Sequence, residues 1–427
     1  MSMVVQHNMQ AANANRMLGI TSGAQAKSTE KLSSGYKINR AADDAAGLTI
    51  SEKMRKQIRG LDKASSNAQD GVSSVQTAEG ALTEVHSMLQ RMNELAVQSA
   101  NGTNSSDDRQ AIQDEVDQLT TEIDRVAETT KFNEIYLLKG DNSNTKNVYM
   151  KGHDAGLKGS LTDGAKSATF TMDELKTGDK VTIAGKEYSI GSTVADAKKT
   201  YAAAADGEKV TIDGTEYTVV GATGTEDAGA NKLKVASLDA KVKDGSTVSY
   251  KTTTVKAMTD ADNNGIDDDD SSIISKDVAE SKIKAELLTA NNIGTVNQAA
   301  TVEDANTANG KTSYTIHKGY ATVADTLSFN LHVGADADMT NKITVDIDTM
   351  NSANLGIKGI NVKDASGTEA TYAIDAIADA VAKVSSQRSA LGAVQNRLEH
   401  TIDNLDNISE NTSSAESRIR DTDMAKE

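Results

Sequence analysis

The sequence contains no proline, no cysteine and no tryptophan among its 427 residues. Average usage of about 5% would supply roughly 20 prolines in a chain of this length. Because proline removes a backbone donor and clashes with the preceding turn, its absence favours long, uninterrupted helices. Without cysteine the chain can form no disulfide and has no thiolate to act as a nucleophile or a metal ligand.

Aromatic side chains are also scarce, at 3% of the residues. Since large rings dominate the energetics of compact cores, this chain must bury its apolar surface in another way. Helices packed side by side are the simplest solution. The length is sufficient for roughly two to four domains.

The formal net charge is -17, although residues 1–60 carry nine Lys or Arg against four Asp or Glu. Affinity for nucleic acid would need basic patches, so the acidic balance argues against it. No apolar run approaches the roughly 20 residues that span a bilayer, and the N-terminus lacks the apolar core of a signal peptide. We therefore expect no membrane segment, and either a cytosolic protein or export by a route without such a signal.

Apolar residues near both ends of the chain recur with the spacing of buried helix seams. One seam predicts a helix over about 60–100, and a second follows the stop at 101–104 and the capping pair Ser105 and Asp108. The seam residues are Val72, Val75, Leu82, Val85, Leu89, Met92 and Ala96, then Ile112, Val116, Leu119, Ile123 and Val126, and near the C-terminus Ile374, Ile377, Val381, Val384, Leu391, Leu398, Ile402, Leu405 and Ile408. The three seams can all be buried if they face one another in a common core. We therefore expect the C-terminal helix to return beside an N-terminal helical hairpin.

Residues 141–370 have a different character, with much Thr, Gly, Val, Lys and Asp in short alternating runs. The segment GDKVTIAGKEY at 178–188 returns 29 residues later as GEKVTIDGTEY at 207–217. Each copy predicts a β-hairpin with a two-residue turn, and Ala195 to Ala205 predicts a short helix between the two. The expected fold is mainly α: a long antiparallel helical bundle of the N- and C-terminal segments, with an inserted α+β variable region that contains β-hairpins.

One acidic loop has the opening pattern of a calcium site. Asp260, Asp262, Asn264 and Gly265 match D-x-D-x-N-G, in which alternate oxygens face one hard cation. Ser271 stands at the twelfth position, where a bidentate Glu is required. The alternative, an acidic turn that stays solvated, is favoured because the ligand set is incomplete.

The sequence gives little support to catalysis. It has no H-E-x-x-H, G-x-S-x-G or P-loop pattern. The histidines are scattered, at His7, His86, His153, His317, His332 and His400. We therefore predict neither an enzyme nor a cofactor.

Three long motifs lie in the terminal regions: NRAADDAAGL at 39–48, LQRMNELAVQSANGT at 89–103 and LGAVQNRL at 391–398. They resemble signatures of bacterial flagellin, the subunit of the flagellar filament. The resemblance covers about 1–140 and 371–427, and it is silent on the region between them.

This resemblance implies an inner-tube helix at 1–43, a helical-bundle core at 44–140 plus 371–427, and a variable, surface-exposed insert at 141–370. It implies a structural subunit that polymerises with copies of itself for motility. The family is exported unfolded, which places the protein outside the cell, in the bacterial flagellum. The implied partners are further subunits, a flagellar export chaperone, the filament cap and, as described below, an immune receptor.

The C-terminal end departs from the family pattern. Similar proteins continue for a few tens of residues beyond a segment like 421–427 and form a further inner-tube helix. We therefore expect a truncated flagellin that polymerises poorly, with residues 1–43 lacking their partner helix and mobile. Met1 and Ser2, ahead of Met3, are interpreted as a cloning addition.

The resemblance also implies a ligand of the innate immune receptor TLR5. The receptor-contacting motif of the family maps onto Arg91 and Leu95 on one helix and Glu115 on the next. An Arg beside an exposed Leu and an acid would suit an interface hot spot. The alternative is that Leu95 belongs to the core seam and that Arg91 and Glu115 are ordinary solvated charges.

Two other functions remain open. The insert could be an adhesin or glycan-binding module displayed on the filament, with Tyr188, Tyr217 and Tyr250 on contact faces, although tyrosine on a half-buried sheet usually packs. A related hook-junction protein is disfavoured, because the motif at 89–103 resembles flagellin itself.

Overall fold

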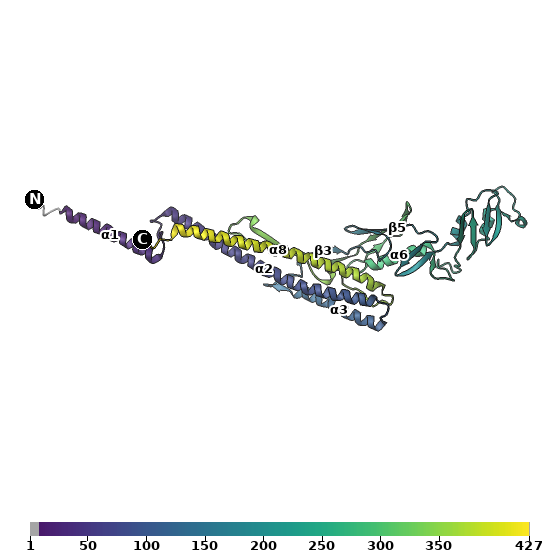
Figure 1. Ribbon diagram of the computed structural model, residues 1–427, viewed down its shortest axis with the longest axis horizontal. Coiled ribbons are helices and arrows are strands. Elements are labelled where there is room, and N and C mark those ends of the chain that lie inside the picture. Colours follow the sequence, from purple (N-terminus) through teal and green to yellow (C-terminus); the bar gives the residue numbers. More distant parts are fainter. Residues whose placement is uncertain (1–7, 427) are drawn as a thin grey trace.

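The structure is a computed structural model that describes residues 8–426, and it forms a long rod (Figure 1). An isolated helix occupies one end, a helical bundle the middle and a strand-rich region the other end (Figure 1). Within the described residues, the longer helices are α1 Met9–Ser34, α2 Ala45–Ala100, α3 Ser106–Thr129, α6 Lys276–Asn291 and α8 Thr368–Arg420.

The bundle is built on α2 and α8, which run antiparallel along most of their length (Figure 1). The predicted seams face each other: Leu82, Leu89 and Leu391 are fully buried in one continuous core. The predicted return of the C-terminal helix beside the N-terminal hairpin is therefore confirmed. Ile408 was predicted to lie in the buried seam, but it is 37% exposed. It lies near the end of the bundle, where α8 has fewer neighbours.

The helical hairpin of α2 and α3 is confirmed together with its predicted start signal. Ser105 accepts a hydrogen bond from the Asp108 backbone N–H, and the Asp108 carboxylate accepts one from the Ser105 backbone N–H. This capping box satisfies donors that the first turn leaves unpaired. Buried Arg109 donates to the carbonyls of Ser99 and Asn101, and so closes the end of α2.

The strand-rich part contains several small sheets. Near the bundle, β3 pairs with β17 and β18 pairs with β19, and further out the sheet orders are β14-β16-β5-β4, β13-β7-β6 and β10-β9-β8-β11-β12. The strands are β1 Lys131–Phe132, β2 Ile135–Tyr136, β3 Asp141–Tyr149, β4 Ser160–Asp163, β5 Ser167–Asp173, β6 Lys180–Ile183, β7 Lys186–Ile190, β8 Lys209–Ile212, β9 Thr215–Val219, β10 Lys232–Leu233, β11 Thr247–Tyr250, β12 Thr253–Lys256, β13 Ile273–Ile274, β14 Thr301–Val302, β15 Asn306–Ala308, β16 Lys311–His317, β17 Tyr320–Asp325, β18 Leu327–His332 and β19 Lys342–Ile347.

The repeated segments form the predicted hairpins, β6–β7 and β8–β9, in equivalent register. Their turns, Ala184-Gly185 and Asp213-Gly214, have positive φ at both central positions, which matches the twist of the flanking strands. The predicted helix between them is α4, Val194–Lys199. The two copies nevertheless belong to different cores. Val181 and Ile183 pack in one core, whereas Val210 and Ile212 pack in a second core further out along the rod.

The last part of the predicted insert packs with the bundle. Val345, Ile347, Leu355 and Val362 are buried in the same core as the seam of α2 and α8. They come from β19, from the short helix α7 (Ser352–Leu355) and from the extended segment that leads to α8. The root of the insert is thus part of the bundle, whereas the tip, residues 194–257, has a core of its own.

Candidate functional site

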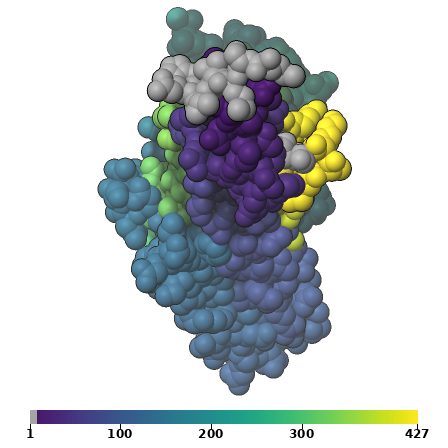
Figure 2. All heavy atoms as spheres, turned by 90° about the vertical axis from the view of Figure 1, so that its left-hand side faces the viewer, coloured from purple at the N-terminus to yellow at the C-terminus, as the bar shows by residue number. Residues whose placement is uncertain are grey.

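Helix α1 is the most exposed long element of the chain. None of its residues, Met9–Ser34, is buried, and Figure 2 shows it standing in front of the bundle when the rod is viewed from that end. Met17, Leu18 and Ile20 are 56%, 67% and 59% exposed. An isolated helix is marginal in water, because its stability in proteins comes mostly from packing an apolar face. Within residues 8–426, Met17, Leu18 and Ile20 are therefore left mostly uncovered.

An elbow at residues 35–38 attaches α1 to the bundle. Gly35 has a φ of 74° and ends the helix in the left-handed conformation, which glycine adopts without steric cost. Two backbone hydrogen bonds then tie the elbow to the end of α8, one from Lys37 N–H to the Arg420 carbonyl at 2.7 Å and one from Thr422 N–H to the Gly35 carbonyl at 3.0 Å. Ile38 is buried at 3% exposure.

Tyr36 is the centre of this elbow. The guanidinium carbon of Arg420 lies 4.9 Å from the ring centroid and that of Arg55 lies 5.8 Å away, distances at which the ring quadrupole attracts a cation. Arg420 pairs with Glu52 at 2.6 Å and Arg55 with Glu416 at 3.4 Å. Segments nearly 400 positions apart in the sequence are therefore joined by one aromatic and charged cluster.

The elbow lies within the segment 1–43, which was expected to lack its partner helix. In this segment α1 has no buried residue, whereas residues 35–38 are held by the end of α8. Tyr36 also forms a β-bridge with Asp421. Residues 1–7 of the predicted inner-tube segment, including His7, lie outside the described residues.

The predicted receptor residues fall into two environments. Arg91 on α2 and Glu115 on α3 are joined by a 2.8 Å ion pair and are 48% and 44% exposed, and Glu94 also pairs with Arg91 at 3.2 Å. Hydrogen bonds to Glu115 and Glu94 raise the pKa of Arg91. Leu95 is 1% exposed. The expectation of an exposed Leu95 is wrong, because this residue lies three positions after Met92 on the buried seam.

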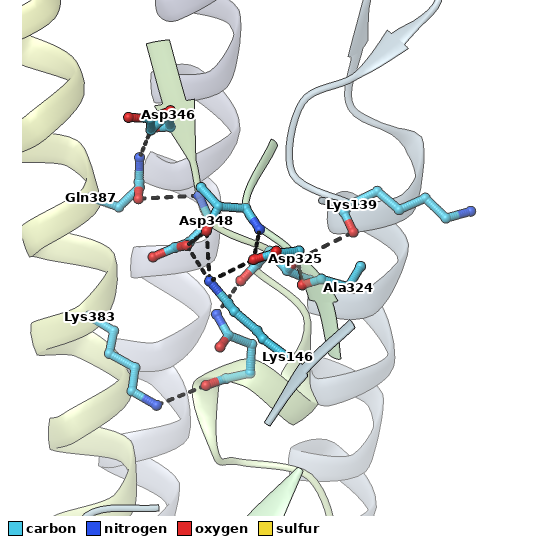
Figure 3. Close-up of polar contacts among 11 residues, drawn as sticks. Lys139, Lys146, Ala324, Asp325, Asp346, Asp348, Lys383 and Gln387 are labelled. Atoms are coloured by element: carbon cyan, nitrogen blue, oxygen red, sulfur yellow. Dashed lines mark hydrogen bonds and ion pairs between the residues drawn. The ribbon is translucent and has the colours of Figure 1, made fainter. Parts of the chain in front are cut away.

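A polar network that sequence reasoning missed lies at the root of the insert (Figure 3). Lys146 of β3 donates to Asp348 at 2.7 Å and to Thr326 at 2.7 Å. Gln387 of α8 donates to the Asp346 carbonyl at 3.0 Å and accepts from the Asp348 backbone N–H at 3.4 Å. The side chain of Gln387 thus continues the backbone pairing of β19, and the network ties the insert to the bundle.

The calcium candidate folds as an acidic turn. The carboxylate of Asp260 accepts hydrogen bonds from the backbone N–H groups of Asn264 and Gly265, both at 2.9 Å. Asp262 accepts from the side-chain amide of Asn264 at 2.8 Å. Across residues 8–426, no group of three or more His, Cys, Asp or Glu side chains is placed to hold a metal ion.

In the same part of the chain, no helix is long and apolar enough to cross a membrane.

Comparisons with known proteins agree with the terminal motifs. Residues 5–143 match the bacterial flagellin N-terminal helical region and 374–427 match the C-terminal helical region. A flagellin of Clostridium tyrobutyricum is 38% identical, over 100% of this chain and 93% of that protein. Flagellin C of Vibrio anguillarum is 34% identical, over 100% of this chain and 91% of its own length. A solved structure of FliC from Burkholderia pseudomallei is 17% identical, covers 77% of this chain and 99% of that chain, and has a TM-score of 0.28.

The matched regions contain the bundle helices described above. The N-terminal match spans the whole of α1, α2 and α3, and the C-terminal match spans nearly all of α8. Full-length alignment to relatives also runs through the strand-rich insert. The chain therefore belongs to the bacterial flagellin family, whose members are structural proteins of the flagellar filament and not enzymes.

Proposed function

We propose that α1 is an assembly surface, by which this flagellin subunit packs against neighbouring copies in the filament. Membership of the family supports a structural role in the filament, whose components are exported. The observation that carries the proposal is a 26-residue helix with no buried residue, on which the large apolar side chains of Met17, Leu18 and Ile20 are exposed. Burying one such side chain is worth about 1.5–3 kcal/mol, so several copies packed together would stabilise a helix that is unsupported in the monomer.

The elbow supports the same proposal. Because Tyr36 is held between Arg55 and Arg420, α1 leaves the bundle in a defined direction instead of hanging from a free linker. Such pre-organisation lowers the ordering cost of association. A helix aimed along the rod can then meet the corresponding helix of the next copy.

Seeded polymerisation tests this assembly surface. The chain is incubated with short filament seeds, and the pelleted fraction is measured after centrifugation, with filaments counted by electron microscopy. Leu18→Glu is expected to reduce the pelleted fraction at least tenfold, because a charge cannot be buried between apolar helices. Val296→Glu is the control, since Val296 is 45% exposed but lies in the insert. Equal pelleting of the Leu18→Glu and Val296→Glu variants with seeds would contradict the proposal.

We also propose that the surface formed by Arg91 and Glu115 contacts TLR5. Their ion pair links α2 to α3 on the exposed side of the hairpin, and Glu94 completes an acidic rim around the guanidinium. Exposed ion pairs contribute little to stability, about 0–1 kcal/mol, so this one is free to exchange partners at small cost. Leu95 supports the surface from beneath and is not part of the contact proposed here.

Binding to the TLR5 ectodomain, measured by surface plasmon resonance, tests the receptor proposal. Arg91→Ala and Glu115→Ala are each expected to weaken binding at least tenfold, with the helical circular dichroism unchanged. Arg125→Ala is a matched control, because Arg125 has an equivalent exposed ion pair with Glu122 on α3. Undetectable binding of the unmodified chain, or equal losses in all three variants, would rule out this contact.

The remaining partners are proposed from family membership: an export chaperone, the filament cap and further subunits.

For the insert, an adhesin or glycan-binding role stays a prediction. Tyr188, Tyr217 and Tyr250 are half-buried, and Tyr250 donates a hydrogen bond to Glu208 beneath Lys251. Hydrogen bonds from Tyr250, the Ala205 backbone and Lys251 lower the pKa of Glu208 to about 2. These contacts hold Tyr250, Glu208 and Lys251 together in the folded tip.

A further inference from the structure

A hollow of about 300 Å³ lies at the root of the insert, where β3, α7 and α8 meet. Its walls are mainly apolar: Met150 follows β3, Ile293 follows α6, and Leu355 ends α7. The helix α8 contributes Lys383 and Asp379. Sites for small molecules begin at about this size and combine apolar walls with a few polar groups.

Lys383 is the polar group that distinguishes this hollow. Its ammonium donates one hydrogen bond, to the Asn354 carbonyl at 2.8 Å, and Figure 3 shows the side chain reaching from α8 toward that carbonyl. No carboxylate among residues 8–426 lies within ion-pair distance of its Nζ atom. Burial lowers the pKa of Lys383, although Asp379 and Asp348 act in the opposite direction. An ammonium has three N–H donors. The half-buried Lys383 can therefore donate further hydrogen bonds to a ligand.

Asp379, which also lines the hollow, is paired with another lysine. Asp379 pairs with Lys151 at 2.9 Å and approaches the His153 ring at 3.5 Å. The loop that carries His153 is fixed, because Asn291 accepts from its backbone N–H and donates to its carbonyl. Because Asp379 pairs with Lys151, the ammonium of Lys383 has no ion-pair partner of its own at the hollow.

We infer that this hollow binds a small monocarboxylate with a compact apolar body. The carboxylate accepts hydrogen bonds from Lys383, and the apolar body lies against Met150, Ile293 and Leu355. A dianion such as a phosphate monoester fits less well, because only one cation is unpaired and Asp379 would repel the second charge. A neutral molecule of the same shape would leave the ammonium uncompensated.

Nuclear magnetic resonance with 13C-labelled methionine methyl groups tests this inference on the full chain. Benzoate is expected to shift the Met150 methyl signal to saturation, whereas benzyl alcohol and phenyl phosphate need at least tenfold higher concentrations. Lys383→Met should abolish the preference for benzoate over benzyl alcohol. Lys358→Met is the control, since Lys358 is exposed and lies outside the hollow. Ala382→Phe should block binding by filling the hollow while leaving Lys383 in place.

The outcomes separate the alternatives. The site is supported if benzoate binding is saturable, if Ala382→Phe removes it, and if Lys383→Met abolishes the preference for benzoate over benzyl alcohol. Equal binding of benzoate and benzyl alcohol, unchanged in Lys383→Met, would show an apolar hollow without charge recognition and overturn the inference. Absence of any Met150 shift, or an equal loss in Lys358→Met, would also overturn it. Thermal unfolding of each variant shows whether its fold is intact.

Discussion

At the scale of single residues, the functional side chains of this flagellin depend on partners that are distant in the sequence. Tyr36 contacts Arg420, and Lys146 pairs with Asp348. Neither pair has a local pattern, so no spacing rule could find them. Of the three residues taken from the family motif, Arg91 and Glu115 form an exposed ion pair, whereas Leu95 is buried in the bundle core.

The first prediction concerns Asp348. Burial pulls the pKa of Asp348 upward, but hydrogen bonds from Lys146 and Thr326 outweigh it, so the net shift is downward. An aspartate with a lowered folded-state pKa stabilises the fold above its unfolded pKa of about 3.9, and this contribution is lost as pH falls through the folded pKa. Asp348→Asn should therefore cost about 1 kcal/mol at pH 7, a value reduced because both partners are partly exposed.

Urea unfolding of wild type and Asp348→Asn at a series of pH values checks this sign. The difference in unfolding free energy should be largest at neutral pH and shrink below about pH 3.9. Asp70→Asn, at an exposed position of α2, is the control and should show no such trend. A difference that stays constant with pH would mean that the charge of Asp348 is not what stabilises the insert root.

At the scale of elements, the terminal helices were largely predictable from the sequence. A seam of apolar residues at steps of three and four predicts a helix and its buried face, because both follow from 3.6 residues per turn. The hairpins β6–β7 and β8–β9 were predictable for a similar reason, since a two-residue Ala-Gly or Asp-Gly turn needs positive φ at both positions. The elbow was not predictable, because its stability comes from the end of α8.

The second prediction concerns this elbow. Tyr36→Ala removes the ring that Arg55 and Arg420 share, and should release α1 while leaving the bundle intact. Hydrogen exchange at the Lys37 and Thr422 amides should accelerate at least tenfold, because their backbone hydrogen bonds open more often. The exchange of α2 amides within the bundle should be unchanged.

Tyr36→Phe is the matched control. It keeps the ring and loses the hydrogen bond that Arg55 donates to the Tyr36 hydroxyl at 3.2 Å. Exchange at the elbow should then rise by about fivefold, since one partly buried hydrogen bond is worth about 1 kcal/mol. Equal acceleration in both variants would assign the elbow to the hydroxyl and not to the ring between the two cations.

At the scale of the whole molecule, the rod is a series of separately packed cores. The bundle core, the middle core around Phe170 and Tyr314, and the tip core follow one another along its length. The root of the insert belongs to the first of these, through Val345 and Ile347. Deleting the whole predicted insert, 141–370, would therefore remove part of the bundle core, at a cost of about 2–5 kcal/mol for each large apolar residue lost.

The third prediction is that the tip can be removed alone. Ser192 and Met258 are joined by a 2.9 Å backbone hydrogen bond, so a two-glycine linker can replace residues 193–257. The shortened chain should unfold with the bundle stability unchanged to within about 0.5 kcal/mol, because distant sites with no shared partners act independently. Circular dichroism measures the stability, and X-ray scattering should show a shorter maximum dimension. A large loss of bundle stability would show that the cores are coupled.

The sequence alone determined the class of this protein, because helix seams, turn residues and family motifs are local patterns that short-range geometry imposes. It predicted a helical bundle with an inserted α+β region, and family membership followed from the terminal motifs. Tertiary structure decided which segments share a core, which charges pair and which helix keeps its apolar side chains exposed. These depend on contacts between residues hundreds of positions apart, such as Tyr36 with Arg420 and Gln387 with β19, and only the folded chain brings them together.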